Sequence, residues 1–194
     1  MAGWTRHQGQ AVALPRANVD TDQLIPARFM SASRAEGYGR FLLHDLREGD
    51  PDFPLDRHPQ ASILVAGENF GCGSSREAAV YALVDAGFRV VVAPSFADIF
   101  AGNAVNNGLL TVATDQARAI LAVLGDGTLS GTADLAAGTL RIGDFDIALT
   151  LPEAVREKLI NGWDDIDLTR AHSGEIRNFR DRRKSDHPWA FPST

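Results

Sequence analysis

The chain has 194 residues, of which 44% are hydrophobic and 23% are charged, a composition that suits one globular domain with a sizeable core. Its formal net charge of -6 offers no overall electrostatic attraction for nucleic acid, so we expect no nucleic-acid partner. No apolar run approaches membrane-spanning length, and residues 1–10 lack the apolar core of a signal peptide, so we expect a cytoplasmic protein that does not bind membranes.

The first sixty residues predict one short strand followed by a long irregular segment. Residues 10–14 form an apolar run that is typical of a strand. The polar cluster from Asn18 to Asp22 is rich in turn formers, and we interpret it as an Asx turn rather than as a metal site. Residues 28–59 combine weak periodicity with several glycines and prolines, which predicts a functional loop or lid.

From residue 61 onward, apolar runs alternate with helical patterns. We expect strands at 61–66, 88–93 and 109–113 and helices at 75–86, 95–106 and 115–124. Gly87 and Gly108 follow the first two helices, and Ser95 is expected to cap the second. The short connections predict parallel strands joined by right-handed crossovers.

The last part of the chain predicts a small antiparallel extension, one more helix and a polar end. Strand-like runs are expected at 132–135, 139–142 and 145–151, and helices at 153–160 and 173–184. Residues 171–194 are predicted to be a polar C-terminal tail, loose beyond residue 184, and the basic run within it is interpreted as a solvated helix face. We therefore predict one α/β domain over residues 1–194, with a mostly parallel central sheet flanked by helices.

The most informative segment joins the expected strand at 61–66 to the next helix. Gly71, Cys72 and Gly73 form a tight loop that can approach a ligand closely, and Ser74, Ser75 and Arg76 are expected in the first turn of the helix. Free backbone N–H groups and the helix dipole favour an anion there, so the segment suits a small molecule with carboxylates. The alternative is an ordinary helix start capped by either serine.

Three known glycine-loop motifs do not fit this segment. A dinucleotide-binding fingerprint needs a third glycine where Arg76 stands, and a phosphate-binding loop needs a lysine before the serine. The nucleophile elbow of a hydrolase has one serine flanked by glycines at alternate positions. The pattern is therefore that of a carboxylate site or of a plain helix cap.

Cys72 is the only cysteine of the chain. A thiol between a helix N-terminus and an arginine could have a lowered pKa, but the five histidines that could serve as its base are distant in sequence. We interpret Cys72 as a small packing residue of the loop. One thiol also excludes an iron–sulfur cluster held by this chain alone, and we predict no metal site in it.

Three blocks in order give the chain a specific resemblance over roughly residues 5 to 170. They are residues 18–29 (NVDTDQLIPARF), 69–77 (NFGCGSSRE) and 93–100 (APSFADIF), followed by 163–169 (WDDIDLT). Together they resemble the small subunits of 3-isopropylmalate dehydratase, the swivel-domain partners in the aconitase superfamily.

The resemblance implies a hydro-lyase subunit that isomerises 2-isopropylmalate to 3-isopropylmalate in leucine biosynthesis, active only as a heterodimer with a large subunit. That large subunit would carry a 4Fe-4S cluster, whose iron takes the leaving hydroxide as a Lewis acid. Ser74 matches the serine that acts as the base. Ser75 and Arg76 match substrate-binding residues, with Arg76 holding a carboxylate of the hydroxy-diacid.

Residues 28–59 match the loop that sets specificity, and the candidate contacts with the substrate's side group are Arg28, Phe29, Met30 and Arg34. The chain departs from the family pattern there, since the loop after Phe29 is poor in lysine and threonine, and Ala78 stands where the family usually has histidine. The departures leave open a related methyl- or dimethyl-substituted malate. The further alternatives are a non-catalytic carboxylate-binding module and, more weakly, an enzyme that depends on Cys72.

Overall fold

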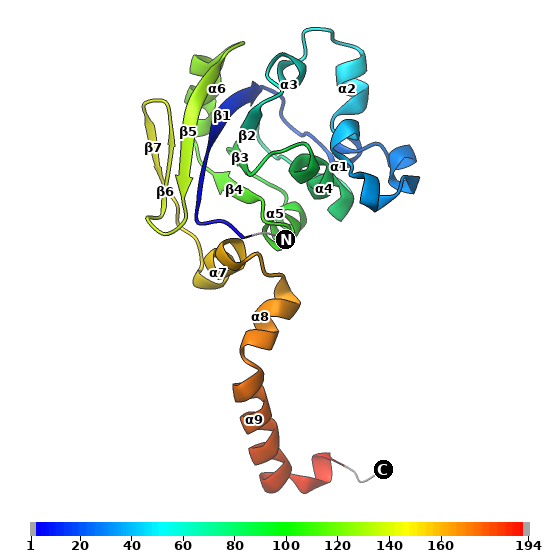
Figure 1. Cartoon of the computed structure of the whole chain (residues 1–194), viewed down its shortest axis with the longest axis vertical. Coiled ribbons are helices and arrows are strands. Elements are labelled where there is room, and N and C mark those ends of the chain that lie inside the picture. The colour runs from blue at the N-terminus through cyan, green and yellow to red at the C-terminus, as the bar shows by residue number, and fades with distance from the viewer. Residues whose placement is uncertain (1–2, 192–194) are drawn as a thin grey trace.

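One mixed sheet of seven strands organises residues 3–191, the part of the chain that the computed structural model describes (Figure 1). The strand order is β4-β3-β2-β1-β5-β6-β7. The strands are β1 (Arg6–Leu14), β2 (Ala61–Ala66), β3 (Val90–Ala93), β4 (Leu110–Ala113), β5 (Thr128–Asp134), β6 (Thr139–Ile142) and β7 (Phe145–Ala148). β1 to β4 pair in parallel, and β5 to β7 continue the sheet in antiparallel fashion from β1. The predicted α/β class is confirmed, with the antiparallel extension joined to the parallel part in one sheet.

The parallel strands are apolar on both faces because helices cover both faces. Along β2, Ile63 and Val65 face one core cluster while Leu64 and Ala66 face the other, and all four are fully buried. The helices α4 (Glu77–Asp85) and α5 (Asp98–Asn106) contribute to the cluster that contains Leu64 and Ala66. The cluster that contains Ile63 and Val65 is covered by α6 (Gln116–Leu124) and α7 (Glu153–Asn161).

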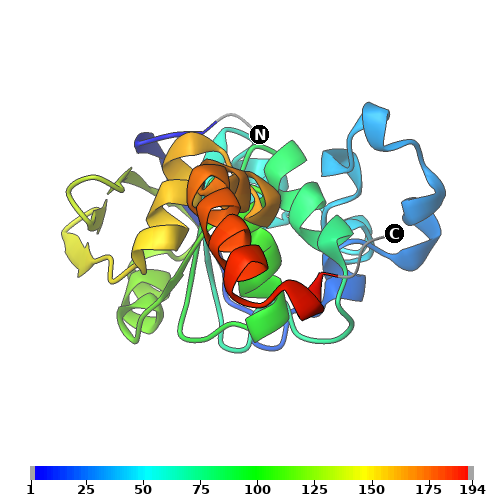
Figure 2. The same cartoon turned by 90° about the horizontal axis from the view of Figure 1, so that it is seen from below.

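Residues 21–59 form a series of short helical turns beside α4, on the opposite side of the body from β6 and β7, and the predicted lid, residues 28–59, is the part after α1 (Figures 1 and 2). The elements of the series are α1 (Thr21–Leu24), η1 (Ala27–Ser31), η2 (Arg34–Glu36), η3 (Gly39–Phe41), α2 (His44–Glu48) and α3 (Pro54–Arg57). Phe53, Leu42 and Leu43 are buried in the core, so the lid is packed against the body by its own apolar side chains.

A helical arm extends away from the body after α7 (Figure 1). It consists of α8 (Asp165–Ala171), α9 (Ser173–Asp186) and the short turn η4 (Pro188–Ala190). A capping box of Asp164 and Asp167 begins α8, which the sequence analysis did not predict. The expected loose tail beyond residue 184 is wrong for residues 185–186 and 188–190, which are helical, and its last three residues lie outside the described range.

Three other expectations also need correction. β1 begins at Arg6, four residues earlier than predicted. α4 begins at Glu77, so the two serines precede it and neither is its N-cap. Ser95 does not cap α5, whose N-cap is Ala97 without a side-chain hydrogen bond. Within residues 3–191, no helix is both long and apolar enough to cross a membrane.

Candidate active site

The loop of residues 67–76 is held by hydrogen bonds to two distant segments. On one side, the amide of Gly71 donates to the carbonyl of Val19 (2.8 Å), and the amide of Thr21 donates to the carbonyl of Cys72 (2.9 Å). On the other side, the amide of Phe70 donates to the carbonyl of Ser95 (3.1 Å). The loop therefore has a defined conformation that depends on residues far away in the sequence.

Polar side chains complete this support. Ser95 accepts a hydrogen bond at its Oγ from the amide of Asn69 (2.9 Å), which explains why it is not available as a helix cap. Asn69 in turn donates through its side chain to Oδ1 of Asn18 (2.8 Å), and both asparagines have a positive φ. Thr21, only 2% exposed, donates its hydroxyl hydrogen to the carbonyl of Ser74 (2.9 Å).

Gly71 is required by both conformation and space. Its φ is +76°, and a Cβ at this position would lie 2.1 Å from Cγ of Phe100. Phe100 belongs to an aromatic cluster with Phe70 and Phe96, whose ring centroids lie 5.4 to 6.4 Å apart. The loop thus packs directly on the aromatic rings of Phe100 in α5 and Phe96 in the segment before it.

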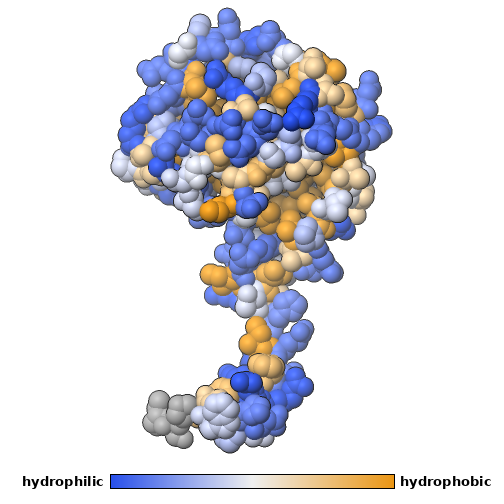
Figure 3. All heavy atoms as spheres, turned by 180° about the vertical axis from the view of Figure 1, so that it is seen from behind, coloured by the Kyte–Doolittle hydropathy of each residue, from blue (hydrophilic) through white to orange (hydrophobic). Residues whose placement is uncertain are grey.

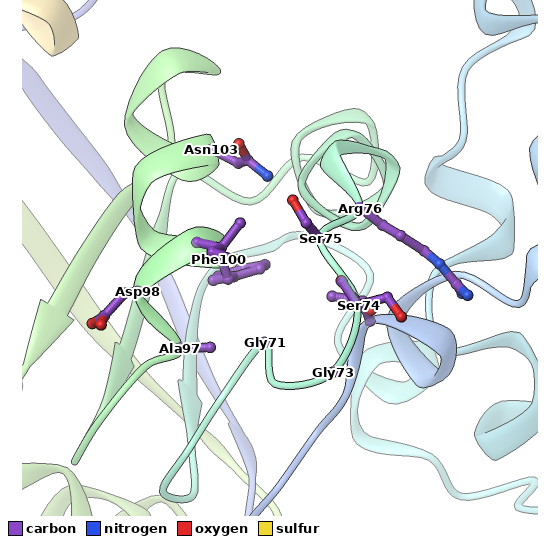
Figure 4. A pocket seen from close by; sticks show the side chains of 11 residues that line it. Gly71, Gly73, Ser74, Ser75, Arg76, Ala97, Asp98, Phe100 and Asn103 are labelled. Atoms are coloured by element: carbon purple, nitrogen blue, oxygen red, sulfur yellow. Dashed lines mark hydrogen bonds between the residues drawn. The ribbon is translucent and has the colours of Figure 1, made fainter.

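A cavity of about 240 Å³ lies between this loop and α5 (Figure 4). It is lined by Thr21, Gly71, Gly73, Ser74, Ser75, Arg76, Ala97, Asp98, Ile99, Phe100 and Asn103. The N-terminal ends of α4 and α5 both border it, and neither has a side-chain cap. Two uncapped helix ends at one cavity provide backbone donors and positive dipole ends for an anion.

Ser74, Ser75 and Arg76 come together at this cavity, just before α4 rather than inside its first turn. Both serines are exposed, while the Arg76 side chain is only 22% exposed and pairs through Nη1 with Asp22. Figure 4 shows Arg76 extending away from α5 toward α1, with Ser75 on the side of Asn103. The remaining donors of the guanidinium fork can still bind a carboxylate.

Glu77, the first residue of α4, is held by neighbours other than residue 78. Its carboxylate accepts a hydrogen bond from Nδ2 of Asn107 (2.7 Å). Burial, together with a hydrogen bond to Glu77, raises the pKa of Tyr81. Ala78 is half-buried against the core. The Glu77 carboxylate therefore has partners in Asn107 and Tyr81, whereas Ala78 offers it no hydrogen bond.

The four predicted lid contacts do not line this cavity. Arg28 pairs with Asp45 (Nη1 to Oδ2, 3.0 Å) and lies over Phe29, which stacks on Phe41 with centroids 4.4 Å apart. Met30 is 36% exposed. The four residues remain predicted contacts with the substrate's side group.

Arg34 is held at the far end of α4. It pairs with Asp85 (2.7 Å), the last helical residue, and its guanidinium carbon lies 4.3 Å from the ring centre of Tyr81. Nine helical residues separate that end from the serines, a distance of about 13 Å. The observed position of Arg34 therefore fastens the lid to α4.

Cys72 is half-buried in the loop and does not line the cavity. Among residues 3–191, one group has the composition of a metal site: His44, Asp45 and Glu48 on α2. Asp45 is already the partner of Arg28, and His44 contacts the same carboxylate at 3.0 Å, so the group is part of the lid's internal packing.

The contribution of α5 was missed by the sequence analysis. Asn103, Ile99 and Phe100 border the cavity, but their positions depend on how α5 packs beside α4. The only sequence signal was the third block of the family resemblance, residues 93–100, which leads directly into α5.

Comparisons with known proteins agree on one family. The family model of the aconitase C-terminal domain matches residues 1–117. A curated relative from Shewanella baltica, "3-isopropylmalate dehydratase small subunit", is 44% identical over 192 residues, covering 92% of this chain and 96% of the relative. A relative of the same name from Halalkalibacterium halodurans is 44% identical over 187 residues, covering 91% and 96%.

A solved structure shows the same fold. The crystal structure of 3-isopropylmalate dehydratase (leuD) from Methanocaldococcus jannaschii superposes with a TM-score of 0.68 at 27% identity, covering 90% of this chain and 99% of that one. The mixed sheet and the helices that cover it thus belong to a fold already known from a protein of that name.

Proposed function

The chain belongs to the family of 3-isopropylmalate dehydratase small subunits, and on that premise we propose that it isomerises 2-isopropylmalate to 3-isopropylmalate together with a large subunit. It is a subunit of a hydro-lyase of leucine biosynthesis. Since its curated relatives carry the isopropylmalate name, another substituted malate and a non-catalytic module are not favoured. A cytoplasmic location is part of the same proposal.

The observation that carries the proposal is that Ser74, Ser75 and Arg76 all line one cavity between two helix ends, with the Arg76 guanidinium extending from it toward Asp22 of α1. Arg76 has donors left beyond its bond to Asp22, and these bind one carboxylate of the hydroxy-diacid. Ser75, on the side of Asn103, binds the substrate from the α5 side. The backbone donors of the helix ends favour the remaining negative charge.

Ser74 acts as the base that takes the proton from the carbon next to a carboxylate. A serine hydroxyl is a poor base unless its alkoxide is stabilised, and the cavity offers Arg76 and the positive ends of α4 and α5 for that purpose. Ser74 is exposed in the isolated chain, so water must be excluded by another surface. A large subunit that covers the cavity would provide that surface.

The residues of this chain do not fit an iron–sulfur cluster, because Cys72 is its only thiol. We assign the 4Fe-4S cluster to the large subunit, as the small-subunit name of the relatives suggests. The chemistry of this chain is then to bind the diacid, orient it and hold the proton at the Ser74 oxygen.

Reconstitution tests the proposal. The purified chain is mixed with a cluster-loaded large subunit and 2-isopropylmalate, and the unsaturated intermediate is followed by its ultraviolet absorbance. We expect turnover only when both chains are present. A complex that forms but turns over no alkylmalate would favour the non-catalytic module.

A further inference from the structure

The helical arm of residues 165–190 has large apolar side chains that nothing in the described chain covers. Ile166 is 62% exposed, Ile176 47%, Phe179 59% and Trp189 79%, and together they make up more than half of the large exposed hydrophobic side chains in residues 3–191. Figure 3 shows apolar atoms along the arm beside hydrophilic ones. Several large apolar side chains gathered on one projecting element indicate an interaction site.

The arm also has unpaired positive charge. α9 contains five basic and three acidic side chains, a net charge of +2 in a chain whose total is -6. Within residues 3–191, four of the basic side chains have no carboxylate partner: Arg177, Arg182, Arg183 and Lys184. At the tip, Phe179, Arg182, Arg183, Asp186 and His187 line a hollow of about 210 Å³, in which two guanidinium groups face one carboxylate. That combination suits a carboxylate next to an apolar side chain.

The base of the arm is fixed to the body. Lys158, 11% exposed, pairs with Asp165 at the start of α8, and Asn106 at the end of α5 donates to the same carboxylate (3.1 Å). The arm therefore starts at one end of α5, while the cavity lies at the other end of the same helix. A protein that covers the cavity along α5 reaches the arm as well.

The arm lies in the part of the chain that the family model does not match. The matching family model, residues 1–117, describes a C-terminal domain and ends before the arm, whereas the curated relatives are separate small subunits. A domain in the same chain as its partner benefits from a high effective concentration. A separate subunit must replace that benefit with additional contact surface.

We propose that the arm of residues 165–190 docks on the large subunit, inserting Ile176 and Phe179 into an apolar groove that is rimmed by carboxylates. This inference rests on the proposed function, because it takes the large subunit as the partner. A second copy of this chain is the competing occupant, and two arms side by side would bring like charges together.

The test measures assembly separately from catalysis. Sedimentation velocity with the wild-type chain, the I176S/F179S variant and the large subunit of the same organism gives the dissociation constant without substrate. We expect at least a tenfold weaker complex for I176S/F179S and for R182E/R183E. Val123→Ser is the matched control, because Val123 is 61% exposed on α6, which covers the other face of the sheet, and its complex should stay within twofold of wild type.

Several results would overturn the proposal. These are unchanged binding by both arm variants, an equal loss with Val123→Ser, or no complex with the wild-type chain. A dimer of the chain alone that I176S/F179S dissociates would identify the second copy as the occupant instead. A tight wild-type complex that the arm variants weaken but that turns over no alkylmalate would support the arm's role and refute the catalytic proposal.

Discussion

The loop of residues 67–76 and the C-terminal arm differ in what holds them in place. The loop is hydrogen-bonded to residues 18–21 and 95–97 and lies on the ring of Phe100. For residues 173–191, the hydrogen bonds and ion pairs within the described chain all stay inside the arm. The comparison indicates that the chain by itself fixes the conformation of the proposed site, whereas nothing outside the arm in residues 3–191 fixes α9.

The largest effect is expected at the loop, from Ser74→Ala. If Ser74 is the base, turnover should fall by on the order of 10³-fold, within the range for loss of a general base. The complex with the large subunit should form as before, because only a hydroxyl is removed from an exposed side chain. Steady-state kinetics of the reconstituted enzyme give the answer, with Ser130→Ala on the exposed face of β5 as the control. A Ser74→Ala enzyme within tenfold of wild type would remove Ser74 from this role.

The next prediction concerns the stability of the same loop. Gly71→Ala places a methyl group against Phe100 and in a positive-φ conformation, so it should destabilise the chain by about 3 kcal/mol. Gly87→Ala is the matched control, because Gly87 has φ +100° and nothing within 4 Å of the added Cβ, which leaves only a conformational cost of about 1 kcal/mol. Urea unfolding followed by circular dichroism measures both. Equal losses would show that Phe100 does not support the loop.

Arg76→Lys tests the binding side of the loop. A lysine places one point charge where the fork now contacts Asp22 and has donors left for a substrate carboxylate. We expect the Michaelis constant to rise about tenfold, a loss of about 1.4 kcal/mol, with a smaller change in turnover. Substrate titration of the reconstituted enzyme measures it. Unchanged kinetics would show that Arg76 serves only to fasten the loop to α1.

The sequence predicted the loop better than its surroundings, for a physical reason. Gly71 and Gly73 have a positive φ, a conformation that the turn itself requires. The strand-turn-helix arrangement could therefore be inferred from neighbouring residues alone. Ser95 looked like a helix cap because caps are local, but it bonds to Asn69, which lies 26 residues away. The position of the α5 residues that line the cavity also depends on tertiary packing. α8 was missed because its residues are mostly polar and its capping box involves two aspartates.

An exposed ion pair, Arg28–Asp45, contributes to the lid, and its contribution should depend on pH. Arg28, with His44, lowers the pKa of Asp45 to about 2. A carboxyl whose pKa is depressed in the folded state stabilises that state above its unfolded pKa near 3.8, and the stabilisation is lost as the pH falls toward 2. Both side chains are about half exposed, so the effect is small and local.

Hydrogen exchange of residues 28–48 measures this effect. Protection should be constant above pH 4, after correction for the intrinsic exchange rate, and should decrease between pH 4 and pH 2. Asp45→Asn should reduce the pH dependence in that interval, and the remainder belongs to other lid ion pairs such as Arg34–Asp85. A lid that loses protection only together with the central strands would contradict a separate role for the Arg28–Asp45 pair.

The smallest effect on stability is expected for arm substitutions in the isolated chain. Ile176 and Phe179 are about half exposed and belong to neither core cluster. The double substitution I176S/F179S should therefore change the free energy of unfolding by no more than about 0.5 kcal/mol. Urea unfolding of the isolated chain measures it under the conditions used for Gly71→Ala. A loss above 1 kcal/mol would mean that the arm packs on its own body in solution. In that case the arm and the loop would both be stabilised by the chain itself, and the distinction between them would disappear.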